Sequence, residues 1–295
     1  MGRVIDGTLY EYLPKKYCFE FGSFKSENVL IFTGGLGDKI ATVPYSIPLY
    51  KALKEIGWSL INFDFSSSGG GWGTGSLARD FEEMSALVKY LKSEEGGSRK
   101  KIGLMGHSTG CQNTMYYFTK GERDENYISL DFGILQASAS DREGLDLFLS
   151  KEEIEEANSL AKKLIDEGNP KELMPYKYVG DIFDTPINAY RWYALYTQRG
   201  DDDFFSTYLL DEELRKTFGV MDKPLLVLFS GSDEYVPESI DKDKLMKRFK
   251  NATTPGMWSE NSTIVKGGAH ALGEGSEPGA MDLALNSVVK FIQSL

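Results

Sequence analysis

The stretch that decides the fold is Lys101-Ile102-Gly103-Leu104-Met105-Gly106-His107-Ser108-Thr109-Gly110. Its first five residues have the pattern of a short buried strand, and the pattern from Ser108 onward is typical of a helix that continues to Thr119. A G-x-S-x-G pentapeptide between a strand and a helix predicts a sharp turn with the serine at its tip. The flanking glycines have a steric reason, because a side chain at either position would collide with the strand or the helix. This setting favours Ser108 as a nucleophile over an ordinary glycine-rich turn.

Outward from this turn, short apolar runs alternate with longer amphipathic stretches. Residues 8–12 and 17–21 indicate an antiparallel hairpin. Further strands are expected at residues 28–33, 59–65, 102–105, 130–136, 225–230 and 262–266. Helices are expected at residues 45–56, 76–92, 108–119, 242–249 and 280–294. This alternation predicts an α/β fold with a mostly parallel central sheet and helices on both faces.

One stretch, residues 141–222, breaks the alternation. It shows no strong strand pattern, and Ser150 followed by Glu153 is a capping-box signature for a helix. Residues 189–197 and 211–218 also have helical patterns. We therefore expect one core of residues 1–140 and 223–295, with residues 141–222 inserted as a helical lid or cap. Most of the many aromatic residues in this insertion are expected to form its own core.

The composition excludes several classes of function. The chain has 295 residues and a formal net charge of −11, which argues against binding to nucleic acid or to anionic lipid. Its 2 Cys and 2 His are too few, and spaced wrongly, for a disulfide framework, a zinc finger or a multi-histidine metal site. No metal and no cofactor are expected. Asp201-Asp202-Asp203 is interpreted as a solvated acidic loop, and Cys111 as a buried apolar residue.

The sequence also bears on two further possibilities, a location in a membrane and a dinucleotide-binding site. The apolar runs are too short to cross a bilayer and the N-terminus lacks a signal-like segment, so a cytoplasmic protein is expected. Gly73-x-Gly75-x-x-Ala78 fits a loose dinucleotide pattern, but it does not follow its strand directly and is disfavoured. The oligomeric state is not indicated.

A serine nucleophile needs a base, and only two histidines are present. His107 adjoins Ser108 in the turn, so its side chain should point away from the hydroxyl and line the pocket. His270 lies on a loop between the last strand and the C-terminal helix, and is therefore the expected base. Asp233 follows the strand at residues 225–230 and is the expected acid, with Glu234 as its competitor.

An oxyanion formed at Ser108 needs two backbone donors. The N–H of Thr109, at the start of the predicted helix, is the first. The second is expected in the turn Thr33-Gly34-Gly35-Leu36-Gly37-Asp38, where we favour Leu36 with Gly35 as the alternative.

At this point the chain resembles an α/β-hydrolase, and more narrowly a family of fungal and plant hydrolases catalogued as a domain of unknown function. Some fungal members of that family are siderophore esterases. The resemblance rests on Gly34-Gly35-Leu36-Gly37-Asp38, Gly71-Trp72-Gly73-Thr74-Gly75-Ser76-Leu77, Met105-Gly106-His107-Ser108-Thr109-Gly110-Cys111-Gln112, Ser140-Asp141-Arg142-Glu143 and Asp233-Glu234-Tyr235-Val236-Pro237. It implies a triad of Ser108, Asp233 and His270. It also implies that Asp141 and Arg142 line or shape the pocket, to which Trp72 is assigned as well.

Together these features predict a serine esterase that forms an acyl-enzyme on Ser108. By resemblance, the ester is that of a hydroxamate siderophore of the fusarinine type, some of which carry free amines. Two alternatives stay open. One is an acyltransferase or lactonase that uses the same triad. The other is a non-catalytic binding protein on a hydrolase scaffold.

Overall fold

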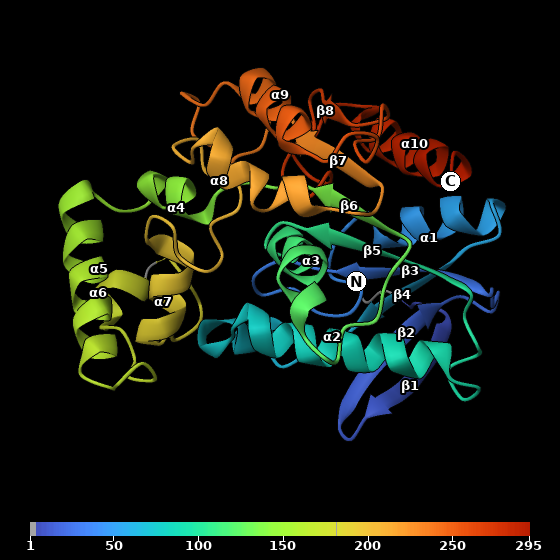
Figure 1. Ribbon diagram of the computed structural model, residues 1–295, viewed down its shortest axis with the longest axis horizontal. Coiled ribbons are helices and arrows are strands. Elements are labelled where there is room, and N and C mark those ends of the chain that lie inside the picture. The colour runs from blue at the N-terminus through green and yellow to red at the C-terminus, as the bar shows by residue number, and fades with distance from the viewer. Residues whose placement is uncertain (1–3, 181) are drawn as a thin grey trace.

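A computed structural model describes residues 4–180 and 182–295. In this part of the chain an eight-stranded sheet runs in the order β1-β2-β4-β3-β5-β6-β7-β8 (Figure 1). The strands are β1 Gly7–Leu13, β2 Lys16–Phe21, β3 Asn28–Thr33, β4 Ser59–Phe63, β5 Lys101–His107, β6 Phe132–Gln136, β7 Leu225–Ser230 and β8 Thr263–Val265. The predicted hairpin is confirmed, since β1 pairs antiparallel with β2. β2 pairs antiparallel with β4, and all later neighbours are parallel.

Helices cover both faces of this sheet. On one face, α1 (Ser46–Glu55) and α10 (Ala280–Gln293) pack their apolar residues into a shared core with β3, β6 and β7. On the other face, α2 (Leu77–Lys92), α3 (Gly110–Thr119) and α9 (Lys242–Ala252) bury a second core. Strands β4, β6 and β7 are buried along their whole length, as expected of parallel strands between two helix layers.

The insertion joins β6 to β7, which are neighbours in the sheet. Its helices are α4 (Asp141–Gly144), α5 (Lys151–Asp166), α6 (Tyr176–Val179), α7 (Ala189–Tyr196) and α8 (Asp211–Arg215). The predicted capping box is present at the start of α5, where Ser150 and Glu153 bond each other's backbone. Figure 1 shows α5, α6 and α7 beside one another, beyond the edge of the layered core. Buried residues of these three helices, among them Ile154, Tyr178 and Trp192, form a separate apolar cluster with Trp72.

The later part of the insertion packs differently. Phe204, Phe205 and Phe218 belong to the core on the α2–α3 side, and Phe218 stacks on Phe249 of α9 with ring centroids 4.7 Å apart. The expectation of a separate aromatic core therefore does not hold for these three, nor for Tyr176, which is 74% exposed. It holds for Tyr178, Phe183, Trp192, Tyr193 and Tyr196. Turning Phe218 inward also ends α8 at Arg215, three residues before the predicted end.

One prediction in this region was wrong. Asp202, expected in a solvated acidic loop, is only 3% exposed. Both of its carboxylate oxygens accept from Nη1 of Arg191, at 2.9 and 2.8 Å. Nε of Arg191 donates to the carbonyl oxygen of Trp72 at 3.1 Å. Because a buried guanidinium needs a paired anion, Asp202 is drawn inward to Arg191. Through its bond to Trp72, Arg191 joins α7 to the 3₁₀ turn Gly69–Thr74.

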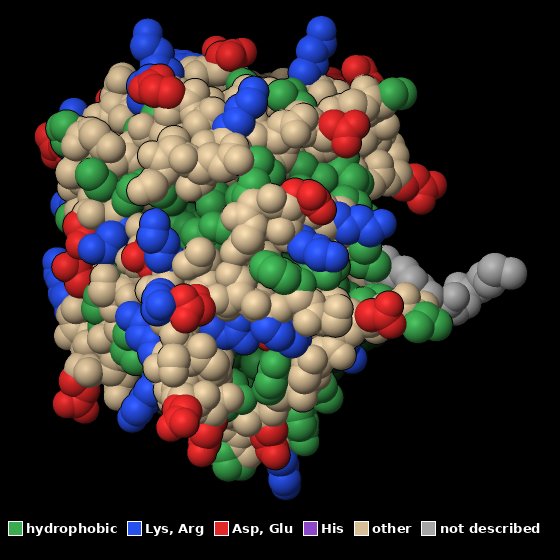
Figure 2. Space-filling view, turned by 90° about the vertical axis from the view of Figure 1, so that its right-hand side faces the viewer, with side chains coloured by type: hydrophobic (Ala, Val, Ile, Leu, Met, Phe, Trp, Pro, Cys, Tyr) green, Lys and Arg blue, Asp and Glu red, His purple; other side chains and the backbone are tan. Residues whose placement is uncertain are grey.

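The face turned away from the insertion carries basic and acidic side chains side by side, with apolar groups between them and no histidine in view (Figure 2). Within the described residues, none of the helices is both long and apolar enough to cross a lipid bilayer.

A buried ion pair ties the antiparallel edge to the parallel sheet. Arg99, just before β5, donates from Nη1 and Nη2 to the two carboxylate oxygens of Glu20 in β2, at 3.0 and 2.8 Å. Glu20 is fully buried and Arg99 is 8% exposed. The next residue forms an exposed pair instead, between Lys100 and Glu27 at 2.7 Å.

Arg99→Met should therefore lower the free energy of unfolding by about 3 kcal/mol, because it leaves the Glu20 carboxylate buried without its main partner. Lys100→Met is the matched control and should cost less than about 1 kcal/mol, since both of its charges are in water. Urea denaturation followed by circular dichroism measures both. Equal losses in the two variants would show that the buried pair does not stabilise this edge.

Candidate active site

Ser108 lies at the turn between β5 and α3. Its φ is +54°, a strained backbone conformation for a residue with a side chain. A Cβ on Gly106 would lie 2.1 Å from the carbonyl oxygen of Gly110, so neither flank of the turn has room for a side chain. The Ser108 N–H donates to the carbonyl oxygen of Gln136 on β6 at 3.0 Å. Helix α3 begins at Gly110 and not at Ser108, because the turn takes up the first two residues of the predicted helix.

His270 and Asp233 meet at the same edge of the sheet. Asp233 follows β7, His270 follows β8, and both are buried. The imidazole Nδ1 lies 2.9 Å from Oδ1 and 2.8 Å from Oδ2 of Asp233. A carboxylate on Nδ1 places the hydrogen there and leaves Nε2 as the basic nitrogen.

Glu234, next to Asp233, also contacts the loop of His270 but bonds its main chain and not its ring. Its Oε2 accepts from the backbone N–H of His270 at 2.9 Å, so it fixes the main chain and Asp233 fixes the ring. The neighbouring Tyr235 ring stands edge-on to the imidazole, with centroids 4.8 Å apart. The two residues that follow Asp233 thus restrict how the histidine can move.

A cavity of about 680 Å³ opens between these loops and the insertion. It is lined by eight of the residues expected in the site: Gly35, Leu36, Trp72, His107, Ser108, Thr109, Asp141 and His270. Asp233 lies behind His270 and outside the lining. Arg142, expected in the pocket, also lies outside the lining, and its Nη1 bonds Asp146 at 2.7 Å.

The two backbone N–H groups expected as the second oxyanion donor, those of Leu36 and Gly35, have different surroundings in the structure. The N–H of Gly35 donates to Oδ2 of Asp38 at 2.8 Å, so it is already engaged. Leu36, the next residue, lines the cavity. This turn passes so close to Ser108 that a Cβ on Gly35 would lie 2.9 Å from its Oγ.

Asp141 places a carboxyl group deep in the cavity. Its Oδ2 accepts from Nε2 of Gln112 at 2.5 Å. Burial, together with the charge of Asp202, raises the pKa of this carboxyl to about 7, against the opposing effect of Arg191. Asp141 therefore changes charge near neutral pH.

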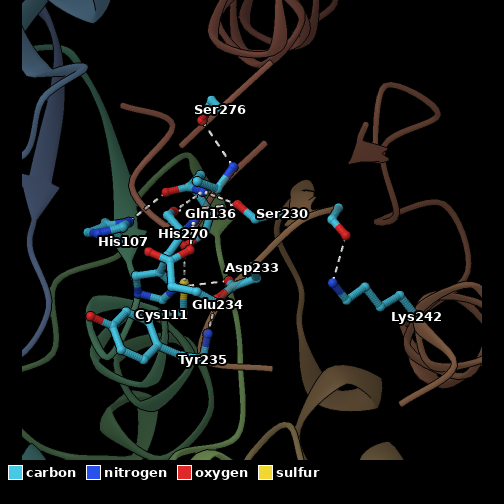
Figure 3. A network of polar contacts seen from close by, with 12 residues as sticks. His107, Cys111, Gln136, Ser230, Asp233, Glu234, Tyr235, Lys242, His270 and Ser276 are labelled. Atoms are coloured by element: carbon cyan, nitrogen blue, oxygen red, sulfur yellow. Dashed lines mark hydrogen bonds and ion pairs between the residues drawn. The ribbon is translucent and has the colours of Figure 1, made fainter. Parts of the chain in front are cut away.

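His107 is held neutral beside His270. Its Nδ1 lies 2.6 Å from Oε1 of Gln136, and its ring centroid is 5.0 Å from that of His270 (Figure 3). Burial, reinforced by the neighbouring His270, lowers the pKa of His107 to about 3. A second imidazolium does not form next to His270 under ordinary conditions.

Sequence reasoning did not single out Gln136, Tyr235 or Phe148. Gln136 had one visible signal, because it is the polar end of an otherwise apolar strand at the sheet edge that carries Ser108. Phe148 and Tyr235 both line the cavity and are 50% and 46% exposed, so together they form an apolar rim at its mouth. Nothing local in the sequence marks that pairing, because the two residues are far apart in the chain.

The site offers no grouping suited to a metal. Among residues 4–180 and 182–295, no three His, Cys, Asp or Glu side chains are arranged to hold a metal ion.

The chain is similar to several known proteins over nearly its whole length. The chain is 37% identical to a UPF0613 protein of Schizosaccharomyces pombe, over 98% of this chain and 97% of that protein. It is 32% identical to the fusarinine C esterase sidJ of Aspergillus fumigatus, over 99% of this chain and 96% of that one. The solved structure of the siderophore hydrolase EstB from Aspergillus fumigatus superposes with a TM-score of 0.84 at 32% identity, covering 99% of this chain and 98% of its own.

These structural likenesses confirm the α/β-hydrolase fold expected from the sequence. A family model described as "Protein of unknown function (DUF1749)" matches residues 1–293. The resemblance seen in the separate motifs thus extends over nearly the whole chain, and the chain belongs to the DUF1749 family.

Proposed function

We propose that this protein is a serine esterase that cleaves carboxylic esters of a siderophore through an acyl-enzyme. The observation that carries the proposal is the geometry of His270. Its ring is held by Asp233 and lines the same cavity as Ser108, which projects from a strained turn. The similarity to sidJ and EstB, which are named for ester and siderophore hydrolysis, supports the choice of reaction and of substrate.

In the proposed mechanism, Nε2 of His270 takes the proton of the Ser108 hydroxyl while Oγ attacks the ester carbonyl. Asp233 stabilises the imidazolium that forms. The oxyanion accepts hydrogen bonds from the backbone N–H groups of Leu36 and Thr109. The imidazolium then protonates the leaving alcohol. Water, activated by the same histidine, attacks the acyl-enzyme and releases the acid.

The acidic lining of the cavity favours a substrate ester that carries a protonated amine. Its described lining residues include four carboxylates against a single lysine, Lys39; the carboxylates belong to Asp38, Asp141, Asp184 and Glu234. Asp38 and Glu234 already accept hydrogen bonds from backbone N–H groups. Asp141 bonds the side-chain amide of Gln112 through one oxygen and lines the cavity. We assign it to the ammonium group of the substrate.

Residues 141–222 are proposed as the lid of this site. Phe148, Phe183 and Tyr196 of the insertion line the cavity opposite the sheet. Phe183 lies with its ring 5.4 Å from that of Trp72 and stacks on Tyr196 at 5.6 Å, forming an apolar wall. Such a wall excludes water from the acyl-enzyme on one side and contacts the apolar part of the substrate.

Ser108→Ala tests the nucleophile. Hydrolysis of a short p-nitrophenyl ester should fall on the order of 10⁴-fold or more, and labelling by a fluorophosphonate probe should be lost. The control is Ser287→Ala on α10, which removes a buried hydroxyl far from the cavity and should keep both activities.

Circular dichroism checks that both variants fold. Full activity in folded Ser108→Ala would exclude the proposed nucleophile. A wild-type protein that labels but transfers its acyl group to an added alcohol in preference to water would instead identify an acyltransferase.

Asp141→Asn tests the proposed ammonium contact. At pH 8 the variant should raise KM for an amine-bearing ester about tenfold, the value of one charge-assisted hydrogen bond, and leave KM for a neutral ester of the same size unchanged. Below pH 6 the difference should shrink, because the pKa of about 7 means that the wild-type carboxyl is then largely protonated. Asp146→Asn, five residues along and outside the cavity, is the control.

The pH dependence of the stability of the fold tests the charge of Asp141 independently of substrate binding. The folded pKa of Asp141 lies above the ordinary value of 3.8, so the folded protein binds the extra proton and loses stability as the pH rises from about 4 to about 7. Asp141→Asn should therefore raise Tm at pH 8 and leave it unchanged at pH 4. An unchanged Tm at both values, together with equal KM changes for the two esters, would contradict the assigned charge.

A further inference from the structure

Gln136 forms more contacts with the site than any catalytic role requires. It ends β6, its side chain is fully buried, and Figure 3 shows that side chain among His107, Ser230 and His270. Its main chain and its side chain bond two different loops. The main-chain carbonyl oxygen accepts from the N–H of Ser108 at 3.0 Å. The side-chain Nε2 donates to the carbonyl oxygen of His270 at 3.1 Å and to Oγ of Ser230 at 3.0 Å.

The orientation of this amide follows from its partners. The carbonyl oxygen of His270 can only accept, so the group that faces it must be the NH₂ of Gln136. Oε1 then points the other way, where Tyr45 Oη donates to it at 2.9 Å and His107 Nδ1 lies at 2.6 Å. His107 must therefore carry its hydrogen on Nδ1. All four hydrogen-bonding positions of the amide are occupied, so the side chain has one orientation.

We propose that Gln136 is a positioning residue that sets the separation and angle between Ser108 and His270. Its carbonyl group holds the turn that carries the nucleophile, and its amide holds the loop that carries the base. The two loops have no shared strand pair, since β5 contacts β3 and β6 whereas β8 pairs with β7. Gln136 is the bridge between them. This inference rests on the proposed function of the same site.

A displaced base has a specific kinetic signature. Misplacing a catalytic group by about 1 Å can cost on the order of 10²-fold in rate, because the reacting atoms no longer meet in line. Substrate binding depends instead on the cavity lining, of which Gln136 is not part. Loss of the bridge should thus reduce kcat and leave KM unchanged. A residue that only stabilises the fold would change neither in the molecules that remain folded.

The test uses Gln136→Met and Gln136→Glu in the full chain. Methionine keeps the volume and removes all four hydrogen bonds. Glutamate keeps the oxygen that faces Tyr45 and His107 and loses the N–H that faces His270. Both should lower kcat about 10- to 100-fold with KM within twofold, and both should slow fluorophosphonate labelling of Ser108 by the same factor. Equal losses in the two variants locate the effect at His270 and not at His107.

Ile134→Ala is the matched control. It lies two residues earlier on β6, on the same face of the strand, and is fully buried in the core. It should lower Tm through lost packing and keep kcat at the wild-type value when assayed well below that Tm.

The outcomes separate the two proposals. A wild-type chain that neither labels nor hydrolyses any ester overturns the proposed function and this inference with it. An active wild type with folded Gln136 variants of unchanged kcat overturns the inference alone. Failure of both Gln136 variants to fold would show that the residue holds the sheet together and does not act by positioning the base.

Discussion

The position of β5 between β3 and β6 is the constraint on which the rest of the site depends. Thr33 pairs with Gly106 on one side, and Gln136 pairs with His107 on the other. This register puts the turn after β3, the strained turn at Ser108 and the polar end of β6 at one level of the sheet. A positive φ at a residue with a side chain costs on the order of 1–3 kcal/mol, and the parallel partners on both sides hold it in place. Without that pairing the turn would relax and withdraw the hydroxyl from the cavity.

The charge of the site follows from how its buried groups are paired. His107 stays neutral because burial and the neighbouring His270 lower its pKa, and together they outweigh the hydrogen bond to Gln136, which raises it. His270, the proposed base, therefore has one carboxylate on its ring and one on its main chain, and the imidazole of His107 beside it is uncharged. Gln136 is itself uncharged, so it holds His107 in place without adding a charge to the site.

Most of the fold could be predicted from the sequence, because strands and helices depend on local patterns. The apolar run of β7 and the capping box of α5 are visible within a few residues. The pairing of Asp233 with His270 could be proposed from chain order and from the small number of histidines. Contacts made by packing could not be predicted. The burial of Asp202 depends on Arg191, and the side-chain bonds of Gln136 depend on loops that follow distant strands. Arg142 was misplaced because the short helix α4 turns it toward Asp146, away from the neighbouring Asp141.

The insertion between β6 and β7 separates the residues of the site in the sequence. In the proposed mechanism the nucleophile, Ser108, precedes the insertion, and the acid and the base, Asp233 and His270, follow it. During synthesis, Ser108 leaves the ribosome well before Asp233 and His270. The serine at that stage has no base and no bridge to the histidine loop, so it has the low reactivity of an ordinary hydroxyl. On this mechanism, Ser108 becomes reactive only once β7 and β8 have joined the sheet, so folding of the segment after the insertion switches the chemistry on.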